Sequence, residues 1–108
     1  MDEIIPPKGS EDYYDAVTSV TPDVHDFYRF YRVPGLMHCS GGNGGQPTAI
    51  WAALTAWVEN GTVPYELPID FPNQKNGTTN RKLCPYPANA VYDGSGDPDE
   101  AASFKCIG

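Results

Sequence analysis

The sequence predicts an α/β fold at the edge of a sheet, followed by a loop-rich tail. Helical and strand-like patterns alternate over the first 60 residues, which is typical of α/β domains. Prolines recur from Pro64 to Pro87 and argue against long regular elements there. The 108 residues suffice for one small domain with a modest core. We therefore expect a folded part over residues 1–61 and a loop-rich extension over residues 62–108 that packs on it.

The first expected helix begins at Ser10, whose hydroxyl can cap the first helical turn. Residues 1–9 precede it as a loop, because Pro6 and Pro7 argue against helix there. The helix ends at Thr21. Its apolar stripe at helical spacing comprises Tyr13, Tyr14, Val17 and Val20.

Residues 27–33 form the strongest strand pattern in the chain, because they are rich in aromatic and β-branched side chains. Aromatic residues fall on both faces, so we expect this strand to lie inside a sheet and to need neighbouring strands. Pro34 and Gly35 end it.

A second helix is expected after Gly44 and Gly45, with Pro47 at an early position and Asn60–Gly61 at its end. Its apolar residues recur at helical spacing, namely Ile50, Leu54, Trp57 and Val58. In the tail, we expect residues 73–82 to form an exposed loop tip. Asp97–Pro98 should start a short helix that runs to about Ser103.

Composition limits the classes of partner. A net charge of −7 argues against nucleic acid and against an anionic membrane surface. No segment is long enough to span a membrane, and residues 1–7 lack the features of a signal peptide. Glycosylation sequons at Asn60 and Asn76, with a cysteine-bearing tail, favour an oxidising, secretory compartment. Secreted character without a signal, and the odd count of three cysteines, indicate a fragment of a secreted protein.

His38 follows the predicted strand in a glycine-rich turn, a place where catalytic groups of α/β folds commonly lie. A lone histidine is more often structural or merely exposed, and that alternative stays open. Asp2 precedes a helix, a strand and then His38, which is the order of acid and histidine in α/β-hydrolases. Asp23 and Asp26 compete for the acid role by proximity, but they precede the strand. Such a carboxylate would fix the imidazole tautomer and stabilise the imidazolium.

The cysteines allow several arrangements. A bridge between Cys84 and Cys106 would close a loop of about 22 residues and stabilise the fold by roughly 3 kcal/mol. Cys39 is then either a free thiol or half of a bridge to another segment. A zinc site built from these cysteines with His38, and His25 in reserve, is disfavoured. Adjacent His and Cys do not easily share one tetrahedral site, and the sequence has no C-x-x-C. A GxSxG nucleophile segment is also absent.

The chain resembles a known family, the tannase and feruloyl esterase family of microbial secreted esterases. The resemblance runs in order through nearly the whole chain, and HCSGG after FYRVPG is its sharpest motif. It implies the C-terminal edge of an α/β-hydrolase fold, with the lid domain and the N-terminal part lying outside this chain. By position it implies that Asp2 is the triad acid and His38 the triad base. The segments that carry it are DEIIPPKGSEDYYDAV, DFYRFYRVPGLMHCSGG, AWVENGTVP, RKLCPYPANAVYDGSGD and AASFKC.

The resemblance also implies roles for the cysteines. Cys39 would pair with a cysteine beside the nucleophilic serine, in a segment outside this chain, and Cys84 would pair with Cys106. The serine, the oxyanion-hole loop and the lid with the family's calcium site all lie upstream, so we expect no cofactor or metal in this chain.

The resemblance implies a carboxylic ester hydrolase, a serine esterase of the tannase or feruloyl esterase type, which cleaves an aromatic-acid ester when complete. The partner of this chain would be the missing N-terminal portion of the hydrolase, and the chain alone should be inactive. The alternative is a non-catalytic, disulfide-stapled, secreted module that binds a carbohydrate or a protein surface.

Overall fold

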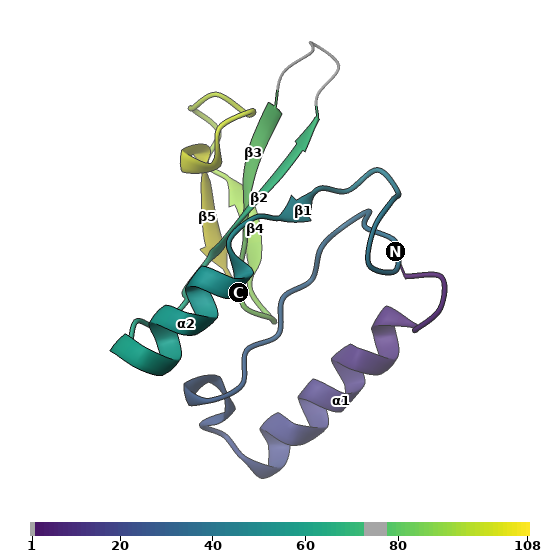
Figure 1. The fold of residues 1–108 in the computed structure, drawn as a ribbon, viewed down its shortest axis with the longest axis vertical. Coiled ribbons are helices and arrows are strands. Elements are labelled where there is room, and N and C mark those ends of the chain that lie inside the picture. The colour runs from purple at the N-terminus through teal and green to yellow at the C-terminus, as the bar shows by residue number, and fades with distance from the viewer. Residues whose placement is uncertain (1, 73–77) are drawn as a thin grey trace.

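A computed structural model describes residues 2–72 and 78–108 and shows helices beside antiparallel strands (Figure 1). This mixed content agrees with the predicted α/β class. The helices are α1 (Pro7–Val20) and α2 (Ile50–Asn60), with 3-10 turns η1 (Val24–Asp26) and η2 (Ala101–Ser103). The strands are β1 (Gln46–Pro47), β2 (Leu67–Pro72), β3 (Thr78–Leu83), β4 (Asn89–Tyr92) and β5 (Phe104–Ile107).

The strands form two small antiparallel sheets, β1-β2-β3 and β4-β5. In the first sheet Leu67 pairs with Leu83, and Ile69 follows Leu67 on the same face because side chains alternate along a strand. These three side chains are at most 7% exposed and form the core cluster. Three partly buried side chains pack against this cluster, namely Tyr31, Val33 and, from α2, Ala53. The core therefore lies where α2 and the chain before β1 meet the sheet.

The prediction of a strand over residues 27–33 is wrong, because no strand of the described residues lies there. This segment runs extended between α1 and the sheets (Figure 1), and it joins a ladder at one point, the bridge between Tyr31 and Pro85. The backbone N–H of Tyr86 also donates to Phe30 O at 2.7 Å. Pairing stops there because Pro85 and Pro87 have no N–H to continue the ladder.

Helix α1 begins at Pro7 rather than at Ser10. Proline is tolerated in the first turn, since that N–H has no partner inside the helix. Of the predicted apolar stripe, Tyr14 is buried, whereas Tyr13 and Val20 are 64% and 83% exposed. The Tyr14 hydroxyl donates to Tyr28 O at 2.9 Å, and its ring meets the Tyr28 ring edge-on. One buried tyrosine therefore anchors α1 to the extended segment.

Helix α2 ends at Asn60, and Gly61 takes a left-handed φ of 67°, which confirms the predicted helix end. Its start differs from the prediction, because Pro47 lies in β1 opposite Ile69 and not in the helix. One stripe of α2, here called the α2 apolar face, is 46% to 78% exposed. It comprises Ile50, Trp51, Leu54 and Val58.

The tail contains more regular structure than the prolines predicted. Strands β2 and β3 have 6 residues each, and Pro68 lies inside β2, where its carbonyl accepts from Thr48 N at 3.3 Å. Of the expected loop tip, residues 73–77 lie outside the described residues and residues 78–82 belong to β3. Asp97 caps a turn through Asp99 N at 2.9 Å, and the short helix after it is η2. The division at residue 61 stays a prediction, although β1 and β2 pair across it.

Candidate active site

The loop over residues 34–45 carries His38 and folds tightly onto itself. Gly44 N donates to Gly35 O at 2.9 Å, and Met37 N donates to Gly41 O at 3.2 Å. A Cβ on Gly44 would lie 2.3 Å from Pro34 O, so the two arms of the loop are too close for a side chain at this position. The glycines therefore hold His38 on a closed loop just before β1.

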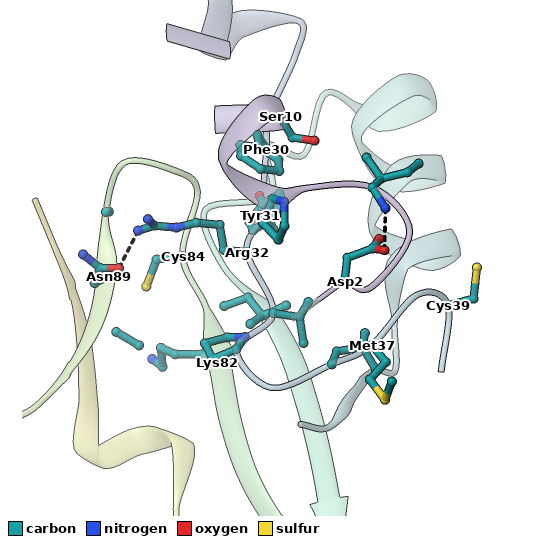
Figure 2. Close-up of a pocket in the computed structure, with 18 residues that line it drawn as sticks. Asp2, Ser10, Phe30, Tyr31, Arg32, Met37, Cys39, Lys82, Cys84 and Asn89 are labelled. Atoms are coloured by element: carbon teal, nitrogen blue, oxygen red, sulfur yellow. Dashed lines mark hydrogen bonds between the residues drawn. The ribbon is translucent and has the colours of Figure 1, made fainter. Parts of the chain in front are cut away.

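Asp2 lies in the short segment before α1, and its own backbone holds its carboxylate in place. Oδ1 accepts hydrogen bonds from Ile4 N at 2.8 Å and from Ile5 N at 2.9 Å. Asp-type side chains commonly cap a turn in this way. Because Oδ1 is occupied, Oδ2 is the oxygen that faces the rest of the chain. Figure 2 shows this carboxylate with one of its backbone contacts.

Asp2 and His38 form the centre of the site. Nδ1 of His38 lies 3.0 Å from Oδ2 of Asp2, and the two side chains are 33% and 28% exposed. The backbone N–H groups of Ile5 and Ile4, and then the hydrogen bond to His38, lower the pKa of Asp2 from 3.8 to about 2. The carboxylate is therefore ionised at neutral pH and can act as a hydrogen-bond acceptor alone.

This ionisation state assigns the histidine tautomer. A hydrogen bond at Nδ1 to an ionised carboxylate requires the proton to reside on Nδ1. In the neutral imidazole Nε2 then carries the lone pair, and it has no hydrogen-bond partner among the described residues. The arrangement leaves a partly exposed basic nitrogen, oriented by a carboxylate on the opposite side of the ring. That geometry suits a general base.

Glu3 also contacts His38, and the sequence reasoning missed it. Its Oε2 accepts the backbone N–H of His38 at 2.9 Å, and this hydrogen bond lowers the pKa of Glu3 below its usual range. The one available signal was the pair of consecutive acids at Asp2 and Glu3. Sequence alone does not reveal which backbone group an exposed carboxylate will reach.

The competing acids do not reach this site. Asp23 precedes the η1 turn and Asp26 ends it, with Asp26 N donating to Asp23 O at 3.0 Å, and no described contact joins either carboxylate to His38. The second histidine, His25, faces the hydroxyl of Tyr14 at 3.4 Å. Asp2 is therefore the acid that the fold brings to His38.

The structure joins Cys84 and Cys106 in a disulfide, the pairing that the resemblance implies. Cys39 has an exposed free thiol and a positive φ of 61°, which is uncommon for a residue other than glycine. Within residues 2–72 and 78–108, no three His, Cys, Asp or Glu side chains cluster as metal ligands. Of the sequon asparagines, Asn60 is exposed at the end of α2, and Asn76 lies outside the described residues.

A cavity of about 750 Å³ opens beside Asp2, the acid of the Asp2–His38 dyad (Figure 2). Asp2, Met37 and Cys39 lie at one end, and residues from the β3–β4 region lie at the other. Arg32 lines the cavity, and its guanidinium donates to Asn89 Oδ1 at 2.6 Å. The carboxylate of the dyad therefore borders a space of the size that binds small molecules. The far end is lined by Lys82, Leu83, Cys84 and Asn89.

Comparisons with known proteins point to one family. The family model described as tannase and feruloyl esterase matches residues 1–107. A mono(2-hydroxyethyl) terephthalate hydrolase from Piscinibacter sakaiensis is 38% identical over 103 residues, which are 88% of this chain and 16% of that protein. A probable feruloyl esterase from Arthroderma benhamiae is 37% identical over 112 residues, covering 97% of this chain and 21% of that protein.

A solved structure agrees with these sequence matches. The crystal structure of an esterase from Aspergillus oryzae superposes with a TM-score of 0.84 at 27% identity, and the match covers 99% of this chain and 25% of that chain. This chain therefore spans between 16% and 25% of the length of these proteins. Among the described residues, no helix is long and apolar enough to cross a membrane.

Proposed function

The chain belongs to the tannase and feruloyl esterase family, and we propose that it supplies the acid and the base of a serine esterase. In this role His38 is the general base and Asp2 is the acid that orients it. The hydrogen bond between Nδ1 of His38 and Oδ2 of Asp2, at 3.0 Å, carries the proposal. It holds the histidine in the tautomer that a base requires.

In the proposed reaction, Nε2 of His38 removes the proton from a serine hydroxyl outside this chain. The serine oxygen attacks the ester carbonyl, and the imidazolium then gives its proton to the leaving alcohol. Water, activated by the same nitrogen, releases the acid from the acyl-enzyme. The negative charge of Asp2 stabilises the imidazolium in both steps.

The substrate class we propose is an ester of an aromatic carboxylic acid. Two relatives support it through their names, because feruloyl and terephthalate groups are both aromatic acyl groups. Catalysis by this chain alone should be negligible, because the proposed nucleophilic serine lies outside it and loss of a triad member costs several orders of magnitude in rate.

The partner we propose is the N-terminal portion of the hydrolase, and the surface of the chain supports a large interface. The solvent-accessible surface is 7173 Å², against about 5,900 Å² for a compact monomer of 11.8 kDa. The excess of roughly 1,300 Å² on this one chain is larger than the roughly 800 Å² that each partner buries in a standard specific interface. The radius of gyration, 14.7 Å, likewise exceeds the roughly 13 Å typical of this length.

Part of this open surface is apolar. The α2 apolar face exposes Trp51 and Val58 by 78% and 77%. Covering such side chains would stabilise the assembly by about 25 cal/mol per Å² of apolar area.

We propose that Cys39, with its exposed thiol, forms a disulfide with a cysteine of the N-terminal portion of the hydrolase.

We propose that the assembled protein is secreted. The Cys84–Cys106 disulfide is typical of an oxidising compartment. The Asn60 sequon is exposed at a helix end and is accessible for glycosylation. The Asn76 sequon has the same expected role.

A chimera tests the catalytic proposal. The matching quarter of the Aspergillus oryzae esterase is replaced by this chain, and hydrolysis of p-nitrophenyl acetate and methyl ferulate is followed. We expect turnover by the chimera and none by the chain alone. His38→Ala in the chimera should lower kcat by about 10⁴-fold or more. His25→Ala is the matched histidine control. Unchanged turnover by the His38→Ala chimera, or turnover by the chain alone at the rate of the chimera, contradicts the proposal.

The cavity beside Asp2 supports a second candidate, a non-catalytic binding module. Its volume of about 750 Å³ suits a small ligand such as a sugar unit. If binding is the function, ligand affinity should survive His38→Ala, because the imidazole would have no chemical task. Calorimetry with ferulate and with cello-oligosaccharides separates the two candidates.

A further inference from the structure

We propose that Glu3 is a positioning residue that fixes the backbone of His38 while Asp2 fixes its ring. The inference deepens the proposed function, and it rests on His38 acting as a base. The carboxylate of Glu3 accepts the backbone N–H of His38 at 2.9 Å. The carboxylate of Asp2 accepts from Nδ1 at 3.0 Å. Two consecutive acids therefore hold one histidine at two separate atoms.

The two contacts constrain different degrees of freedom. The hydrogen bond that Asp2 accepts fixes the direction of the imidazole, but it does not fix the position of the His38 Cα. The hydrogen bond that Glu3 accepts comes from the main chain of His38, so it sets where the side chain starts. With both ends held, rotation of His38 about its side-chain bonds is restricted. A base that serves a serine on another segment needs this pre-organisation, because small displacements cost large factors in rate.

The surroundings of Glu3 make its contact consequential. The hydrogen bonds of Asp2 and Glu3 join the segment before α1 to the His38 loop. The loop has its own internal hydrogen bonds at Met37 N and Ser40 N, which leave the N–H of His38 to an outside acceptor. Because Glu3 touches the backbone and not the ring, it positions the base without sharing in proton transfer.

The tautomer of His38 tests this role without any measurement of esterase activity. Nitrogen NMR of the ¹⁵N-labelled 108-residue chain, at about pH 8 where a free imidazole is neutral, distinguishes Nδ1–H from Nε2–H. We expect Nδ1–H to dominate in the wild-type chain. Glu3→Ala should weaken that preference, because the ring can move away from Asp2 when its backbone is not held. Glu3→Gln should keep the preference, because an amide oxygen can still accept the backbone N–H. Glu59→Ala, at an exposed position of α2, is the matched control and should change nothing.

Asp2→Asn separates the two proposals. If Asp2→Asn shifts the tautomer and Glu3→Ala does not, the positioning role is wrong and the dyad stands. If neither variant shifts it, or if the wild-type chain shows the ratio of free histidine, both proposals are overturned.

Amide exchange of the wild-type chain also tests the positioning role, and it does not depend on whether a variant folds. The His38 amide should exchange with deuterium more slowly than the Cys39 amide, which has no acceptor among the described residues. Equal exchange rates overturn the positioning role.

Discussion

Asp2 and His38 meet at 3.0 Å although 36 positions separate them in the chain. The elements between them explain the meeting. Helix α1 has 14 residues and carries the chain away over roughly 21 Å. The extended residues 27–33 return it over roughly 23 Å at the rise of a strand. Because the two lengths match, the loop that follows the return lies beside the start of the helix (Figure 1).

Asp2→Asn should reduce turnover strongly while the substrate still binds. The amide would present its NH₂ group to Nδ1, which favours the wrong tautomer and removes the charge that stabilises the imidazolium. In the chimera we expect kcat to fall by about 10⁴-fold and KM to stay within a few-fold. Asp12→Asn removes the same charge from an exposed ion pair with Lys8 and serves as the control. Similar kcat values for the two variants would show that Asp2 has no special role.

The acid stability of the chain should depend on Asp2. Its pKa is lowered from 3.8 to about 2 by backbone and His38 hydrogen bonds. A group with a depressed folded-state pKa contributes stability that is present above its unfolded value and lost as the pH falls. The contribution should therefore be complete above pH 3.8 and disappear through pH 2.

Urea unfolding of the wild-type chain and Asp2→Asn measures this contribution across the same window. The difference in the free energy of unfolding should shrink as the pH falls through it. A difference that stays constant across the window would contradict the assignment.

The approach of Asp2 to His38 was open to sequence reasoning, because it depends on the order of elements and on motifs that are local in the chain. Their catalytic roles stay a prediction. Glu3 was not predictable, since its contact is with a backbone N–H that is identical in every residue type. Which exposed carboxylate reaches that N–H depends on how closely two loops approach.

The errors in the fold have a common physical origin. Residues 27–33 have strand-like side chains, but strand formation requires a partner with free N–H groups, and here the facing segment contains Pro85 and Pro87. Conversely, Pro68 did not prevent β2, because β3 and β1 supply partners on its two sides. The end of α2 was predicted correctly, because the left-handed conformation of Gly61 depends on the last helical turn and not on a distant strand.

Gly44→Ala should disrupt the loop that carries His38. Its added methyl group would lie 2.3 Å from Pro34 O, and backbone on both arms would have to move. Gly9→Ala is the matched control, because its Cβ meets nothing within 4 Å and Gly9 lies inside α1. We expect Gly9→Ala to raise the free energy of unfolding by about 0.5–1 kcal/mol and Gly44→Ala to lower it. In the chimera, Gly44→Ala should also lower kcat. Equal effects of the two substitutions on stability would exclude a tight loop at Gly44.

The three cysteines should differ in their effect on stability. Cys84 and Cys106 close a loop with a sequence separation of 22, so their joint replacement by alanine should lower the free energy of unfolding by roughly 3 kcal/mol. Cys39 is exposed and unbridged, so Cys39→Ser should change this free energy little. Unfolding is best measured in the Cys39→Ser background, where no free thiol can exchange with the disulfide. Reductant should then destabilise the bridged chain and leave the double alanine variant unchanged. A loss of stability with reductant in both would mean that the effect does not come from this disulfide.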